Sequence, residues 1–138
     1  PIGHIFPAGA VGQYLHPHQI GGAYAWQSIR ASGAKVVFST DWPVIPVDVM
    51  PNIRAAIAPL NPGPEWTDQT QSLTDTLASY TRDNAWVEFA EDKRGRLTVG
   101  MQADVAVMDR DLFALAPDQI TQAAAALTIC NGRVTYRA

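Results

Sequence analysis

The sequence has 138 residues, 47% of them hydrophobic, with a net charge of −3 and a single cysteine, Cys130. This composition is typical of a globular chain that can bury a core, and its acidic balance argues against nucleic acid as a partner. One cysteine cannot form an internal disulfide, and no apolar run approaches the roughly 18 to 20 residues of a membrane span. We therefore predict a cytoplasmic protein that binds neither nucleic acid nor a membrane.

The first third of the chain predicts half of a βαβ unit. Residues 1–7 are typical of the end of a buried strand, and a loop rich in Gly, Pro and His follows up to Gly22. A helix is expected over residues 22–32, because small and apolar side chains recur at helical spacing and Gly33 supplies a stop.

The run from Val36 to Val44 is the most informative stretch. Its apolar residues do not alternate with polar ones, which predicts a strand buried on both faces. The strand leads into Ser39, Thr40 and Asp41, where α/β enzymes place their catalytic groups. Asp41 is therefore a candidate site residue, and the alternative is a carboxylate that only caps a turn.

Helices and one long loop are expected in the middle of the chain. Residues 51–58 predict a short helix with Ile53 and Ile57 on one face, and the Pro-rich loop 59–71 is a candidate lid edge. The longest helix should begin at Ser72 with a capping box and end near residues 89–92. Its inward face is expected to carry the apolar residues Leu73, Leu77, Tyr80 and Val87.

The last third changes to an alternating pattern. Short strands are predicted at residues 97–99, 103–108, 126–130 and 134–136, with a short helix near 117–124. Asn131-Gly132 indicates a tight hairpin turn, because both positions of such a turn need positive φ.

Four motifs in this order make the chain resemble the amidohydrolase superfamily, in particular the amidohydrolase-3 branch that includes N-substituted formamide deformylases. The matching pieces are Phe38-Ser39-Thr40-Asp41-Trp42-Pro43-Val44, Tyr80-Thr81 with Asn84-Ala85, Gly95-x-Leu97-x-x-Gly100-x-x-Ala103-Asp104, and Thr128-x-x-x-Gly132-x-Val134-x-Tyr136.

The resemblance implies an α/β fold that is the C-terminal part of a larger enzyme. Residues 1–91 would supply strands 7 and 8 of a (β/α)8 TIM-like barrel with their helices, and residues 92–138 part of a composite β-sandwich. The family's other metal ligands, among them a His-x-His pair on strand 1, would lie upstream of this chain.

The resemblance also implies a function. The chain would belong to a metal-dependent amidohydrolase that hydrolyses a non-peptide C–N bond of a small amide or formamide, with a divalent metal, zinc by preference, in the full-length protein. Asp41 would be both a metal ligand and the catalytic proton shuttle, while His4 and Trp42 would contact the substrate. A water beside such a metal has a pKa near 7, which suits a neighbouring carboxylate acting as base and then acid.

Several residues also have simpler interpretations. His4 is more simply a structural histidine, and Trp42 is equally explained by buried packing. The pair His16 and His18 resembles the superfamily's metal pair, but it lies in a polar loop, so we predict that it is exposed to solvent.

Two residues in the last third are given structural roles. Asp104 is expected to fix a turn in the sandwich. Cys130 is expected to be a small buried hydrophobic residue.

Two departures from the family pattern affect the substrate prediction. Relatives usually carry Arg where Gln27 stands and often Arg where Pro59 stands, so substrate preference is expected to differ from that of the better-known members.

The piece alone is expected to be inactive, because one ligand cannot activate water. A rival hypothesis is a non-catalytic remnant or interaction module derived from the same fold. Either way, missing N-terminal barrel strands or self-association should cover its open strand edge.

Overall fold

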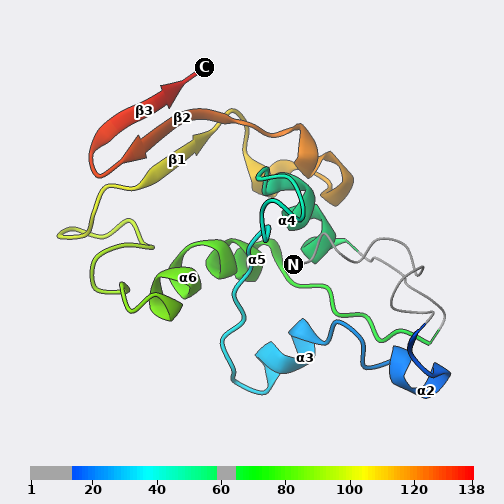
Figure 1. Cartoon of the computed structure of the whole chain (residues 1–138). Coiled ribbons are helices and arrows are strands. Elements are labelled where there is room, and N and C mark those ends of the chain that lie inside the picture. The colour runs from blue at the N-terminus through cyan, green and yellow to red at the C-terminus, as the bar shows by residue number, and fades with distance from the viewer. Residues whose placement is uncertain (1–13, 59–64) are drawn as a thin grey trace.

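The computed structural model describes residues 14–58 and 65–138, which form a small α/β structure with its helices first and a three-stranded antiparallel sheet last (Figure 1). The sheet lies at one end of the molecule, and the first helices lie at the other. The elements are the α-helices α2 (Pro17–Ile20), α3 (Trp26–Ala31), α4 (Met50–Ile57), α5 (Leu73–Tyr80) and α6 (Arg82–Val87), the 3₁₀ helices η2 (Leu112–Ala114) and η3 (Pro117–Gln122), and the strands β1 (Val105–Met108), β2 (Ala125–Cys130) and β3 (Arg133–Arg137). The predicted strand end at residues 1–7 and the first part of the predicted lid edge, up to residue 64, lie outside the described residues.

The first two predicted helices are present, with shifted starts. Helix α3 begins only at Trp26, since Tyr24 has a φ of 55°, and Gly33 follows its end with a φ of 92°. Helix α4 begins at Met50, whose N–H donates to the Asp48 carboxylate over 3.0 Å. Ile53 is 3% exposed, so the predicted apolar face of α4 is confirmed.

The predicted longest helix is two helices, so its prediction as one element is wrong. The N-cap at Ser72 is confirmed, because the Asp75 N–H donates to Ser72 Oγ over 3.0 Å, but the reciprocal bond of the predicted capping box is replaced by one between side chains, from Ser72 Oγ to the Asp75 carboxylate over 2.8 Å. Thr81, with φ −126° and ψ −89°, separates α5 from α6. After this break the helical register no longer turns Val87 inward, and its side chain is 49% exposed.

The predicted strand at Val36–Val44 is not formed among residues 14–58 and 65–138. A strand needs a neighbouring backbone to pair with, and here the backbone groups of Phe38 bond to α5 and α6 instead. The apolar character was still a correct signal of burial at one position, since Phe38 is 6% exposed.

The sheet has the order β1-β2-β3, with both neighbouring pairs antiparallel and one register shift in each ladder. The hairpin turn is confirmed, since Asn131 and Gly132 have φ values of 48° and 78°. Residues 97–99 form no strand, and both Leu97 and Val99 are exposed. The predicted helix near 117–124 is the 3₁₀ helix η3.

Two apolar clusters form the core. One contains Phe38 with Ala55 and Ala56, and the other contains Met50, Ile53, Ile120 and Ala123. Ile57 and Tyr80 pack against both clusters. Helix α4 thus packs against η3, across the predicted boundary between residues 91 and 92, and that boundary itself stays a prediction.

Candidate functional site

Asp41 lies in a tight turn directly after the buried Phe38. Its φ of 53° is in the left-handed region, which Asp tolerates better than most residues. Its N–H donates to Ser39 Oγ over 3.3 Å, and its carbonyl accepts the Val44 N–H over 2.8 Å. The backbone of Asp41 is thereby held by short-range bonds on both sides.

The Asp41 side chain, by contrast, is exposed to solvent. Within the described ranges, no hydrogen bond or ion pair reaches its carboxylate. A turn-capping carboxylate would accept a nearby N–H, as Asp48 and Asp68 do. The alternative that Asp41 only caps its turn is therefore not supported by the geometry.

The segment before Asp41 is held by three helices. The Phe38 N–H donates to the Ser79 carbonyl over 3.3 Å, and the Phe38 carbonyl accepts from Asn84 Nδ2 over 3.1 Å. Arg30 donates to the Val36 carbonyl over 3.2 Å. Helices α3, α5 and α6 therefore define where the turn containing Asp41 begins.

A buried charge network stands behind these contacts. Asp83 is 1% exposed, and its carboxylate lies 2.9 Å from Arg82 Nε, 3.5 Å from the Arg30 guanidinium and 4.0 Å from Lys35 Nζ. Arg30 also donates to Ser79 Oγ, which ties α3 to α5. The network links α3, α5 and α6 around the Phe38 segment.

The charge of Asp83 is set by two opposing effects. Burial raises the pKa of its carboxyl, but the hydrogen bond from Arg82 and the charges of Arg82, Lys35 and Arg30 together hold that pKa below its ordinary value. Asp83 is therefore ionised at neutral pH.

The sequence reasoning missed Asp83, Arg30 and Asn84 as parts of this site. One signal was available: Asp83 lies three residues after Tyr80, on the predicted inward face of the long helix. A buried carboxylate needs a partner of opposite charge, and Arg30 in the predicted helix 22–32 could have been proposed as that partner.

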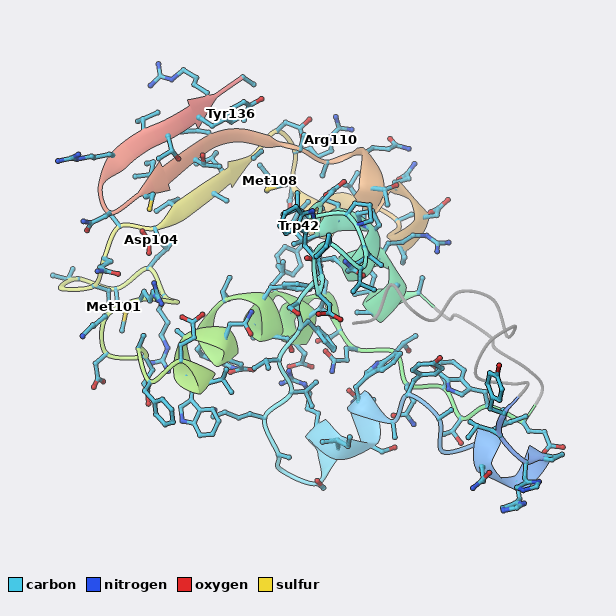
Figure 2. The ribbon with its side chains drawn as sticks, viewed as in Figure 1. Trp42, Met101, Asp104, Met108, Arg110 and Tyr136 are labelled. Atoms are coloured by element: carbon cyan, nitrogen blue, oxygen red, sulfur yellow. The ribbon has the colours of Figure 1, made fainter. Side chains whose placement is uncertain are left out.

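The other predicted site residues are not brought together with Asp41 by a described contact. Trp42 is labelled in Figure 2 and is 69% exposed, so the alternative of buried packing is wrong for this chain. His4 lies outside the described residues. His16 and His18 are exposed, as predicted, and their rings stack with centroids 5.6 Å apart.

The structural roles predicted near the sheet have different outcomes. Asp104, which directly precedes β1 (Figure 2), accepts the Asn131 N–H over 2.7 Å, so the prediction that it fixes a turn is confirmed. Cys130 is exposed, so the prediction of a buried residue is wrong. It is the last residue of β2, where the half-buried strand ends at the exposed hairpin turn.

The turn that contains Asp41 offers one suitable ligand for a divalent cation. Carboxylate oxygen binds such ions, and Asp41 offers an exposed carboxylate. Among the residues that the structure describes, however, no three His, Cys, Asp or Glu side chains converge. A complete metal centre would need ligands from beyond these residues. In the same ranges, no helix is long and apolar enough to cross a membrane.

Comparison with known proteins defines the class of this chain. The amidohydrolase family (amidohydrolase-3) matches residues 2–136, which is nearly the whole sequence, so the chain belongs to this family. It is 27% identical over 119 residues to YtcJ of Bacillus subtilis (strain 168), whose name assigns it to the amidohydrolases. The matched part is 83% of this chain but 22% of YtcJ, so the chain spans about a fifth of the length of that relative. No solved structure matches.

Proposed function

We propose that this chain is the carboxyl-terminal part of a longer metal-dependent amidohydrolase, called the parent protein below, that hydrolyses a non-peptide C–N bond of a small amide or formamide. The observation that carries the proposal is the family match over residues 2–136, within which Asp41 presents a solvent-exposed carboxylate from a fixed turn. In the parent protein, residues 1–91 would complete a (β/α)8 barrel and residues 92–138 a β-sandwich.

The chemistry assigned to this chain is proton transfer by Asp41. Its carboxylate would take a proton from the water as the water oxygen bonds to the carbonyl carbon, and would pass that proton to the nitrogen, which leaves as a neutral amine when the C–N bond breaks. A divalent metal, zinc in our proposal, would lower the pKa of that water when bound. Asp41 would supply one ligand to it, and the remaining ligands would come from upstream barrel strands. Trp42 and His4 would contact the substrate.

The test replaces Asp41 in the parent protein. Asp41→Asn keeps the shape of the side chain but removes the base, so we expect kcat on N-substituted amides and formamides to fall about 10²- to 10⁴-fold. Asp92→Asn, an exposed carboxylate outside the motif, is the matched control and should leave kcat unchanged. Metal content of both variants would be measured alongside turnover. Full turnover by Asp41→Asn would reject the assigned role.

A second candidate function is a non-catalytic interaction module. The observation in its favour is the sheet, in which β1 and β3 each have one edge without a partner among the described strands. Hydrolysis that depends on Asp41 in the parent protein would rule it out, whereas a parent protein without turnover on any amide would favour it.

A further inference from the structure

We propose that Asn84 is a positioning residue that sets the location of the Asp41 carboxylate by holding the Phe38 carbonyl three residues upstream. This inference rests on the proposed role of Asp41. Asn84 lies on α6 and contacts neither water nor substrate in the proposed reaction.

Both polar backbone groups of Phe38 are taken by the corner between α5 and α6. The N–H donates to the Ser79 carbonyl over 3.3 Å, and the carbonyl accepts from Asn84 Nδ2 over 3.1 Å. The Phe38 side chain is 6% exposed, with its ring centroid 5.8 Å from that of Tyr80. Phe38 is therefore fixed in direction as well as in position.

The break at Thr81 makes this arrangement possible. In a continuous helix, the Ser79 carbonyl would accept the N–H of the residue four positions later. Here the Thr81 N–H bonds to the Ala78 carbonyl over 3.2 Å, and the Ser79 carbonyl is left to accept from Phe38. The regular helical hydrogen bonding is interrupted at this point, and the Ser79 carbonyl binds the Phe38 segment instead.

The residue before Asn84 supports the same segment indirectly. Asp83 lies 3.5 Å from the Arg30 guanidinium, and Arg30 donates to the Val36 carbonyl over 3.2 Å. Two adjacent residues of α6 thus restrain the segment, Asn84 by direct contact and Asp83 through Arg30. The contact of Asn84, at Phe38, is nearer to Asp41 in the chain than the contact of Arg30, at Val36.

A displacement of Phe38 would be passed on to Asp41. Only Ser39 and Thr40 lie between them, and the turn is closed by the bonds from the Asp41 N–H to Ser39 Oγ and from the Val44 N–H to the Asp41 carbonyl. Because no described residue restrains the Asp41 carboxylate, its location depends on its backbone. Misplacement of a catalytic group by about 1 Å can cost about 10²-fold in rate.

The variant Asn84→Asp tests the proposal in the parent protein. It keeps the size of the side chain but turns the donor into an acceptor that repels the Phe38 carbonyl. We expect kcat to fall about 10- to 100-fold, with KM changed by less than about threefold. Asn84→Ala, which removes the donor without adding charge, should behave alike.

The matched control is Glu88→Gln, which removes the ion pair between Glu88 and Arg94 at the other end of α6. It disturbs the end of α6 without removing a contact to Phe38, so kcat should stay within about threefold of the wild type. An equal loss of kcat in this control would overturn the assignment to Asn84.

Two readouts separate positioning from general destabilisation. Because Asn84 acts through Asp41, adding Asn84→Asp to Asp41→Asn should cause no further loss, whereas multiplied losses would overturn the proposal. Hydrogen exchange of the Val36–Trp42 peptide should accelerate in both Asn84 variants but not in Glu88→Gln. Unchanged exchange would overturn the proposal whatever the activity. Full turnover by Asp41→Asn would instead reject the proposed function, and exchange would still decide whether Asn84 anchors the segment.

Discussion

Asp83 is a buried residue whose ionisation contributes to stability. Its pKa is held below the ordinary value of about 3.9, so its stabilising effect is complete above that value and is lost as the pH falls through the lowered pKa. We expect peptides covering α3 and α6 in the parent protein to lose protection from hydrogen exchange only below about pH 4, once intrinsic exchange rates are corrected for. In Asp83→Asn the protection at pH 7 should fall by about 3 kcal/mol. The further loss of protection on acidification should be absent in this variant.

The control for this prediction is Glu88→Gln. Glu88 also pairs with an arginine, Arg94, but its side chain is 54% exposed, so its loss should cost less than about 1 kcal/mol. If Asp83→Asn still loses exchange protection below about pH 4, another group is responsible for the pH dependence.

Sequence reasoning succeeded at the residue scale where the signal is local. The exposure of His16 and His18 followed from their polar surroundings, and the turn role of Asp104 is confirmed. The contact of Asn84 with Phe38 joins residues 46 positions apart, and no local pattern records it. The burial of Cys130 was wrongly predicted because its strand neighbours are apolar, although it stands at the exposed end of β2.

The hairpin of β2 and β3 is stabilised by Asp104, a residue that is distant from the turn in the sequence. The Asp104 carboxylate accepts the Asn131 N–H over 2.7 Å, and the Gly132 N–H donates to the Ala103 carbonyl over 3.0 Å. We expect Asp104→Ala to weaken exchange protection of the hairpin by about 1 kcal/mol, because one turn N–H loses its acceptor. The measurement is hydrogen exchange of the peptide spanning β2 and β3 in the parent protein.

Asp104→Asn is the informative comparison for the hairpin, because its side-chain oxygen can still accept the Asn131 N–H. It should stay close to the wild type. If both variants lose protection equally, the charge of Asp104 rather than its hydrogen bond stabilises the turn.

The Ser72 cap and the hairpin turn could be predicted from sequence, whereas the start of α3, the helix interruption and the strand pairings could not. The Ser72 cap and the Asn131-Gly132 turn are each encoded in a few adjacent residues. The break at Thr81 is not, because apolar spacing continues through it and its compensation comes from Phe38 in another part of the fold. Alternation at residues 97–99 predicted a strand, but a pattern does not supply a neighbouring strand.

At the scale of the whole molecule, several large apolar side chains of the described residues are exposed to solvent. They include Trp42 and Phe89, which are 69% and 92% exposed. This surface fits a chain that another segment or another copy covers.

We therefore expect the isolated 138-residue chain to self-associate and to show no amide hydrolysis with or without added divalent metal. Light scattering coupled to size exclusion would measure its mass, and the same sample would be assayed for turnover. Val134→Lys and Tyr136→Lys place charge on the open edge strand β3, where both side chains are about half exposed, and should reduce association. Leu97→Lys adds the same charge to an exposed position outside the sheet and should not. Equal effects of all three variants would indicate general hydrophobic association rather than pairing at the β3 edge. If the isolated chain is a monomer with metal-dependent turnover, the proposal that it needs its upstream partners is contradicted.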